Sequence, residues 1–448
     1  MNRYFLFLAA LLAGGCASIE PGKPPVLPPR NASPATIPVA PVRVPGIISL
    51  RDALALALEH SPGLGVPALE AEALAGAEMQ SGMLPNPTMS VDVENFGRSR
   101  MRLGQLNGPE YTLAFGQLVE LGGKRAARVR AAKLDRRLAL WDYEVARLDL
   151  LSRTARDFVA LLTAQEEAAL AVEGARVGEE TFEAVRAKID AGKVSPVEGS
   201  RASVLRSRSR LEVERTSGLV ASARARLAAN WGGAGAEFEG AAGSLGAPGA
   251  IPDLEGLIAE LSTHPAIAKW QDEVARCGEE LKMARAKRIP NPTVGGGARF
   301  LDESDESAFV VGFSIPLPVL DRNEGGIYEA DRRLAKAKAE QRAMFIERRA
   351  ALVVAHAEAK NARQRVFAFE GEILPAARTA FESTREAYVT GKVGLTDVLD
   401  TERVWFSTRR ELLEALREFH ARKAELEALA GRALDELPSG VKKPQTGN

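Results

Sequence analysis

Apolar residues recur every three or four positions through the middle of each half of the chain, the spacing of a helix that packs against another helix. In the first half, this stripe consists of Leu134, Leu138, Trp141, Val145 and Leu148, followed after one extra residue by Leu151, Ala155, Phe158 and Leu162. From Lys124 to Asp190 there is no proline. As one continuous helix this segment would span ~100 Å. On periodicity alone, a soluble structural coiled coil is favoured.

Each half also contains two short segments in which apolar and polar residues alternate, the pattern of half-buried strands. In the first half the apolar positions are Met89, Val91, Val93, Leu113 and Phe115, and in the second half they are Val294, Phe309, Val311, Phe313 and Ile315. Each strand can reach ~9 to 11 residues, enough to cross a membrane at a tilt. Because single-chain barrels begin at ~8 strands, several copies would have to share one barrel. A small soluble sheet that caps a helical bundle is the alternative.

The two halves of the chain repeat each other in order. Residues Leu84 to Thr88, with Pro-Asn-Pro at their centre, match Ile289 to Thr293, and Gly192-Lys193-Val194 matches Gly391-Lys392-Val393. The offset between the copies is about 200 residues throughout, as expected for a tandem duplication. We therefore predict one repeat at residues 48–235 and a second at 252–431, joined by a Gly/Ala-rich linker at 236–251. Residues 432–448 are predicted to be a loose C-terminal tail.

The N-terminus has the features of a secretory signal peptide. Its apolar run, Phe5 to Ala13, is shorter than the ~20 residues of a permanent membrane helix. Small residues precede Cys16, which resembles the lipidated cysteine of bacterial lipoproteins, and Ala17 in place of Asp resembles those sorted to the outer membrane. We predict a signal peptide at 1–15, a lipid on Cys16 and a proline-rich tether at 16–47. An ordinary signal peptide with a chance cysteine is the alternative.

Composition argues against several function classes. Lys and Arg together number 59, as do Asp and Glu, so the formal net charge is zero and no global attraction to nucleic acid is expected. With Cys16 lipidated, only Cys277 remains, so no intramolecular disulfide can form. The four histidines show no metal-ligand spacing. We expect no catalytic residues, no metal site and no cofactor other than the covalent lipid.

From Ile48 to Gly431 the chain resembles the TolC-like outer-membrane efflux factors, most specifically in the duplicated Pro-Asn-Pro and Gly-Lys-Val motifs. The resemblance implies a mainly helical protein with a membrane barrel: a homotrimer that contributes four strands per chain to a 12-strand barrel on a long coiled-coil tunnel. It also implies a periplasmic adaptor protein and an inner-membrane pump of the RND type as partners. The stretch from Gln117 to Arg125 resembles the heavy-metal branch, of cobalt-zinc-cadmium and copper-silver type, which biases the predicted cargo toward metal cations.

The candidate functional residues lie at the ends of the two predicted hairpins. Gly192, Lys193, Val194 and Ser195 form one turn, and Gly391, Lys392, Val393 and Gly394 form the other; the resemblance implies adaptor contacts there. Asp397 and Asp400 follow the second turn and resemble the family's periplasmic aperture, and residues three apart share a helix face. For Asp397, stabilisation of the helix N-terminus is an equal alternative, worth ~0.3 to 1 kcal/mol.

The predicted function is therefore that of the outer-membrane channel in a tripartite efflux system, anchored by lipid and extending into the periplasm. Two alternatives remain open on the sequence. One is the outer-membrane duct of a type I protein secretion system, and the other is a periplasmic structural coiled-coil lipoprotein. The sequence does not decide the cargo.

Overall fold

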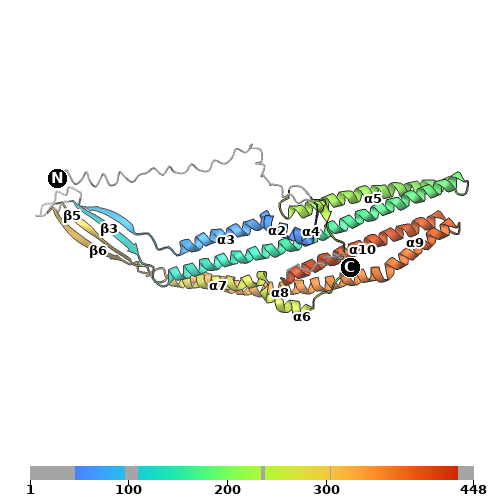
Figure 1. The fold of residues 1–448 in the computed structure, drawn as a ribbon. Coiled ribbons are helices and arrows are strands. Elements are labelled where there is room, and N and C mark those ends of the chain that lie inside the picture. The colour runs from blue at the N-terminus through green and yellow to red at the C-terminus, as the bar shows by residue number, and fades with distance from the viewer. Residues whose placement is uncertain (1–45, 96–108, 234–237, 303, 432–448) are drawn as a thin grey trace, which may run out of the picture. The chain divides into compact units, whose positions relative to one another are not determined.

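The computed structural model describes residues 46–95, 109–233, 238–302 and 304–431, all of which belong to one compact unit that comprises residues 41–448. The predicted signal peptide, Cys16, nearly all of the tether and the C-terminal tail lie outside the described residues. Within the described part, helices lie side by side along one direction, with a sheet at one end and two hairpin ends at the other (Figure 1). The mainly helical class is confirmed.

Each repeat contributes two strands and a long helical hairpin. In the first repeat the elements are α2 (Leu50–His60), α3 (Pro62–Ser81), β2 (Thr88–Glu94), β3 (Glu110–Leu118), α4 (Lys124–Asp190) and α5 (Pro196–Ala229). In the second they are α6 (Leu254–Glu260), the 3₁₀ turn η1 (Leu261–Thr263), α7 (Pro265–Ala286), β5 (Thr293–Leu301), β6 (Glu306–Ser314), α8 (Glu324–Ala368), the π-helix η2 (Phe369–Ile373), α9 (Leu374–Val389) and α10 (Leu395–Ala430).

The first repeat opens with a helix whose start is encoded locally. The Ser49 hydroxyl accepts the Asp52 N–H at 3.2 Å, and the Asp52 carboxylate accepts the Ser49 N–H at 3.0 Å. This reciprocal pair satisfies two backbone donors that a helix N-terminus leaves free. The Ser49 hydroxyl also donates to the Asp52 carboxylate at 2.6 Å, and this bond together with the one from the Ser49 N–H lowers the pKa of Asp52. α2 therefore begins at Leu50.

α4 is one uninterrupted helix of 67 residues, whereas its counterpart in the second repeat is interrupted. There α8 passes into the π-helix η2 and then into α9, whose second residue is Pro375. A proline cannot donate the hydrogen bond that an α-helix needs at this position, and the chain widens into a π turn just before it. The two long helices thus differ in regularity although they occupy equivalent places in the duplication.

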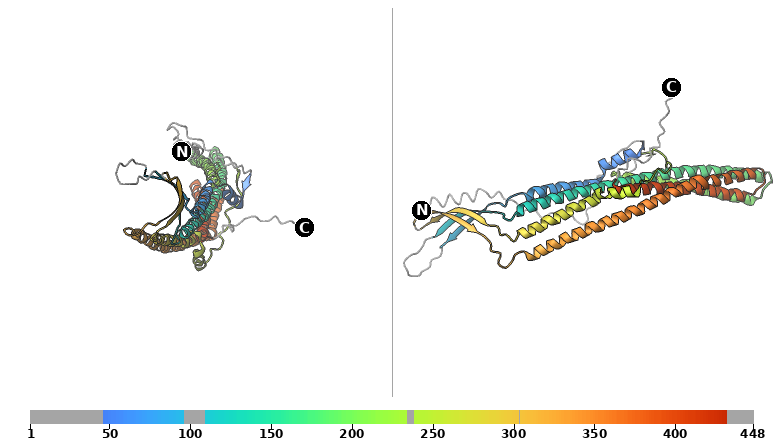
Figure 2. Two further views of the ribbon diagram at one scale, coloured as in Figure 1. Left: turned by 90° about the vertical axis from the view of Figure 1, so that its left-hand side faces the viewer. Right: turned by 90° about the horizontal axis from the view of Figure 1, so that it is seen from below.

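The four longer strands form one antiparallel sheet in the order β2-β3-β5-β6. The central pair joins the repeats: β3 lies against β5 with Glu110 opposite Leu301 and Leu118 opposite Thr293. The sheet is curved (Figure 2). Phe309 and Val311 of β6 are 95% and 86% exposed. The alternation in the sequence therefore places large apolar side chains on a face that no described residue covers.

The main core lies near the middle of the long helices, where the predicted linker packs against them. It brings together Phe158 and Leu161 of α4, Trp231 and Phe419, with Ile48 only 2% exposed. Ile48 belongs to β1 (Ile47–Ile48), which pairs in parallel with β4 (Gly240–Ala241) inside the linker.

The linker is also held by side chains of the helices. Gln165 of α4 donates to the Ala241 carbonyl at 3.2 Å and accepts the Ala241 N–H at 2.8 Å. The His420 Nε2 atom is 3.2 Å from the Gly246 carbonyl oxygen, and His356 Nε2 lies the same distance from that of Pro252. The described part of the linker, from residue 238 on, is therefore a fixed part of this core.

Candidate functional site: the hairpin ends and the groove behind them

The end of the first hairpin is set by a glycine in the left-handed conformation. Gly192 has a φ of +73° and donates its N–H to the Ile189 carbonyl at 2.8 Å, while the Lys193 N–H reaches back to Lys188 at 2.8 Å. These two bonds form a Schellman motif, which ends a helix and favours glycine because it has no Cβ. Ser195 then caps α5 by accepting the Val197 N–H at 3.3 Å.

The second hairpin ends in the same way. Gly391 has a φ of +77° and donates to the Tyr388 carbonyl at 3.1 Å, and the Lys392 N–H donates to Ala387 at 2.9 Å. The repeated Gly-Lys pair is thus explained by one backbone geometry used twice. The lysine side chains are exposed in both turns.

Asp397 and Asp400 lie at the start of α10 and differ in their surroundings. The Asp397 carboxylate accepts the N–H of Gly394, the N-cap residue, at 3.0 Å. This is half of the reciprocal cap seen at α2, because glycine has no hydroxyl to complete it. Asp400 is one turn further on, is exposed and lies 3.5 Å from the Arg403 guanidinium. Asp397 therefore has a helix-capping contact, whereas Asp400 has no such contact.

Contacts that the sequence did not suggest join the two hairpins near their ends. The Lys188 ammonium lies 3.5 Å from the centre of the Tyr388 ring and donates to the Tyr388 carbonyl at 3.1 Å. Arg201 donates to the Thr396 hydroxyl at 2.8 Å. A small apolar cluster lies beside them, with the buried members Val185, Ala202, Tyr388, Leu395 and Val398. No local sequence pattern identifies this contact, because its partners come from different repeats.

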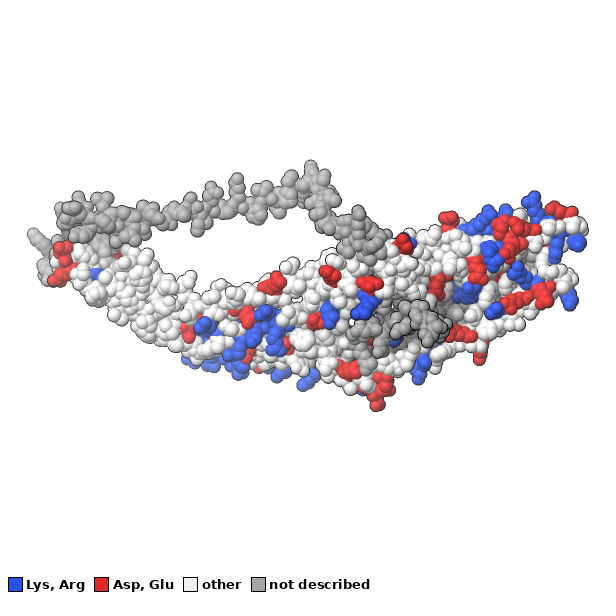
Figure 3. Space-filling view, viewed as in Figure 1, with Lys and Arg blue, Asp and Glu red and all other residues white. Residues whose placement is uncertain are grey.

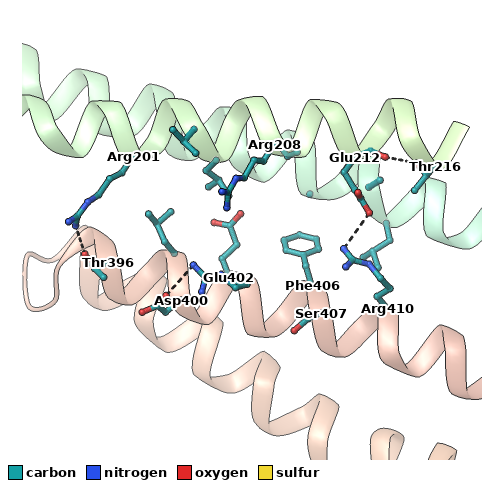
Figure 4. Close-up of a pocket in the computed structure, with 18 of the residues that line it drawn as sticks. Arg201, Arg208, Glu212, Thr216, Thr396, Asp400, Glu402, Phe406, Ser407 and Arg410 are labelled. Carbon is teal, nitrogen blue, oxygen red and sulfur yellow. Dashed lines mark hydrogen bonds and ion pairs between the residues drawn. The ribbon is translucent and has the colours of Figure 1, made fainter. Parts of the chain in front are cut away.

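Behind these contacts a groove of about 810 Å³ runs between α5 and α10, with α4 as its floor (Figure 4). We call it the α5–α10 groove. Leu170 and Gly174 belong to the floor, and Phe406 of α10 packs across it toward Gly174. Glu402 of α10 is 3% exposed and points toward α5. Burial raises the pKa of Glu402 to about 7, and the charge of Arg385 opposes this shift.

At the opposite end of the described unit, the junction between strands and helices is locked across the repeats. Asn291, from the second Pro-Asn-Pro motif, accepts the Leu121 N–H at 3.2 Å and a hydrogen bond from Lys124. Gly122 and Gly123 both have a φ of +73°, which permits the sharp turn from β3 into α4. The second Pro-Asn-Pro motif therefore helps to fix the turn between β3 and α4 of the first repeat.

Charge is distributed unevenly over the visible surface. Lys, Arg, Asp and Glu are dense around the hairpin ends, whereas the sheet carries almost no charged side chain between its outer edge and the start of the helices (Figure 3). Within the described ranges, no helix is both long and apolar enough to cross a membrane.

Metal-ligand chemistry finds little support in the described residues, which contain no group of three or more His, Cys, Asp or Glu able to hold an ion. Burial raises the pKa of the Cys277 thiol to about 11, so it stays protonated near neutral pH. His264, His356 and His420 each place a ring nitrogen 3.1 to 3.2 Å from a backbone carbonyl oxygen. Each of these three rings therefore has a backbone carbonyl as its polar partner.

The chain is thus a duplicated strand-strand-hairpin unit with an apolar sheet at one end and capped hairpin turns at the other. The chain belongs to the outer membrane efflux protein family, whose pattern matches residues 53–233 and 258–432. The TolC-like resemblance carried by the Pro-Asn-Pro and Gly-Lys-Val motifs is thereby confirmed.

Individual relatives refine this assignment. The chain is 32% identical to the cobalt-zinc-cadmium resistance protein CzcC of Cupriavidus metallidurans, over 88% of this chain and 93% of that protein. It is 27% identical to the nickel-cobalt-cadmium resistance protein NccC of Alcaligenes xylosoxydans xylosoxydans, over 68% of each. The fold is also similar to the open state of the Neisseria gonorrhoeae outer-membrane channel MtrE, with a TM-score of 0.71 and 19% identity over 86% of this chain and 89% of that one.

Proposed function

We propose that the protein is the outer-membrane channel of a tripartite efflux system that expels divalent heavy-metal cations of the cobalt, zinc and cadmium type. The observation that carries the proposal is the similarity to a cobalt-zinc-cadmium resistance protein along 88% of this chain. A channel needs no tight metal site, because conduction requires that the ion leave as readily as it enters. The scarcity of metal-ligand groups in the described residues is compatible with this role.

The channel is proposed to be a homotrimer. Among the described strands, β2 and β6 are sheet edges without a partner strand, and open edges are not tolerated in lipid. Three copies of this four-stranded sheet would supply the twelve strands of one closed barrel. Exposed apolar side chains on α8, including Ile346 and Val354, support side-by-side packing with further copies. Native mass measurement in detergent tests the stoichiometry, and a stable folded monomer would contradict it.

The exposed Phe309 and Val311 support contact between the barrel and the outer-membrane lipid. Cys16 is proposed to carry a covalent lipid anchor. The hairpin ends would then lie in the periplasm, where the turns at 192–195 and 391–394 offer the contact to an adaptor protein. An inner-membrane pump of the RND type completes the pathway. Mass spectrometry of the mature N-terminus tests the anchor, since an unmodified peptide that begins elsewhere than Cys16 would refute it.

Metal export is tested in a strain that lacks this chain but retains its pump and adaptor. We expect sensitivity to Co²⁺, Zn²⁺ and Cd²⁺ and accumulation of these ions in the periplasm, both reversed by the parent gene. Unchanged metal tolerance would contradict the proposal. Loss of a secreted polypeptide in place of metal tolerance would favour the protein secretion duct.

Asp397 and Asp400 are proposed to line the periplasmic aperture. Threefold symmetry would bring several of these carboxylates together, and a ring of carboxylates attracts cations. Replacing both with Ala should reduce cation selectivity and block by multivalent cations in planar-bilayer conductance. Asp190→Ala, which removes a charge at the end of the first hairpin, is the matched control. Equal changes in cation selectivity and block in both variants would show that Asp397 and Asp400 of α10 do not form the aperture.

A further inference from the structure

The α5–α10 groove has the size and lining of a small-molecule site. Its volume of about 810 Å³ falls within the range of ligand pockets, which is ~300 to 1,000 Å³. Leu170 on the floor and Phe406 on one wall give it an apolar surface. The Phe406 ring lies over Gly174, where a Cβ would be in ordinary van der Waals contact with it at 3.5 Å.

One carboxylate in this groove has an oxygen without a hydrogen-bond partner. Only 3% of the Glu402 surface is exposed, and its Oε2 atom has no hydrogen-bond partner among the described residues. Figure 4 shows the carboxylate directed from α10 into the space before α5. A buried carboxylate without a partner is costly in its charged form, because it has given up water and gained no donor. The site therefore favours a group that can donate to this oxygen.

The charged groups around Glu402 do not supply this missing hydrogen-bond donor. Arg385 of α9 is engaged with Glu180 at 3.2 Å. Arg403 of α10 lies 3.5 Å from Asp400. Arg208 of α5 points toward Glu402 in Figure 4 but is exposed to water and forms no ion pair with it, and Glu167 of α4 is an acid on the floor. No hydrogen bond or ion pair joins any of these three arginines to the Glu402 Oε2 atom, and an exposed guanidinium is already hydrated, so the buried carboxylate is the group that gains most from a ligand.

We propose that the α5–α10 groove binds a small organic monocation, a primary ammonium attached to an apolar group, with the ammonium on Glu402 and the apolar group against Phe406 and Leu170. An ammonium supplies the missing donor and charge, and an aromatic ring stabilises a nearby cation. A bare metal ion fits less well, because transition metals need several converging ligands and none of the described groups of acids and histidines provides them. The site does not depend on the proposed metal cargo.

The test uses the full-length protein in non-ionic detergent and isothermal titration with 2-phenylethylammonium chloride, with uncharged 2-phenylethanol as the matched probe. At pH 8, Glu402→Gln should weaken ammonium binding by at least about tenfold, because the charge is removed while the shape is kept. Glu411→Gln, the same substitution on an exposed residue of α10, should leave the affinity within about twofold.

A second measurement separates binding from a structural role. The ammonium needs the ionised carboxylate, and Glu402 has a pKa of about 7, so the parent should bind about tenfold more weakly at pH 6 than at pH 8. The Gln variant should lose this dependence.

The proposal would be overturned by equal binding by the Gln and parent proteins, by equal binding of the alcohol and the ammonium, by the same loss in Glu411→Gln, or by a pH-independent affinity in the parent. Displacement of the probe by Zn²⁺ in the parent alone would instead assign Glu402 to metal binding and would also overturn it.

Discussion

The position of β1 leads to a prediction about the length of the proposed tether. β1 is held at the middle of α4, because β4, its partner strand, is bound by Gln165. The proposed lipid on Cys16 would lie at the membrane, near the start of α4 at Lys124. Along a helix that rises 1.5 Å per residue, Gln165 and Lys124 are ~62 Å apart. If the lipid lies there, the chain between Cys16 and Gly46 has to cover about this distance.

The parent chain can cover it and a shortened chain cannot. Thirty residue steps give ~93 Å at the 3.1 Å per residue of a proline-rich extended chain. Deleting residues 24–38 leaves fifteen steps, which reach at most ~52 Å even when fully extended. The lipid and β1 can then no longer both keep their places. Releasing Ile48 from the core costs about 1.5–3 kcal/mol, and the hydrogen bonds from β4 add ~0.5–1.5 kcal/mol each.

Hydrogen exchange followed by mass spectrometry shows directly whether β1 stays paired with β4 or is pulled away. The Glu239 and Ala242 amides donate to Gly46 and Ile48 at 2.8 and 2.7 Å, so they should lose protection by about a hundredfold when β1 is pulled away. The control is the same deletion combined with Cys16→Ser, which removes the anchor and should restore the parent pattern. Full protection in the lipidated, membrane-bound deletion variant would refute the reasoning.

Three further predictions concern single side chains. Tyr388→Phe should stabilise the hairpin ends by ~1 kcal/mol, because it removes a buried hydroxyl without a described partner while keeping the ring; slower amide exchange there is the readout, and a loss of protection would contradict it. Burial lowers the folded-state pKa of His264. The stability of the fold should therefore be full above pH ~6.5 and fall as the pH drops below it. In thermal melts, His264→Ser should reduce this dependence of the melting temperature on pH. Gly297→Ala should prevent correct sheet assembly, because its Cβ would lie 2.2 Å from the Leu113 carbonyl oxygen; a detergent-stable oligomer of parental yield would contradict this.

The sequence was sufficient for features determined by residues close together in the chain. The length of α4 followed from the absence of proline, and the turn at Gly192 needs a left-handed residue that glycine supplies. The alternation around Phe309 correctly indicated a strand with one apolar face. These features depend on local backbone preference and side-chain period, which a single sequence displays.

Features that depend on distant partners could not be read in this way. Glu402 is buried on α10, which packs against α4 and α9, whereas an acidic residue on a helix is ordinarily expected at the surface. The Gly/Ala-rich linker gave no sign that Ala241 would be bound by Gln165, 76 residues away. For Asp397, the sequence left the capping and aperture roles equal, and only the coordinates reveal the hydrogen bond from Gly394.

The pairing of β3 with β5 also constrains the order in which the chain can fold. An exported chain emerges from its N-terminus, so β3 (Glu110–Leu118) is available well before β5 (Thr293–Leu301) has been delivered. Until then the first hairpin of the sheet has an unpaired edge, which is a template for pairing with the wrong chain. Closing so long a loop also slows folding. Until the second repeat arrives, the first repeat therefore carries a sheet edge that is prone to aggregation.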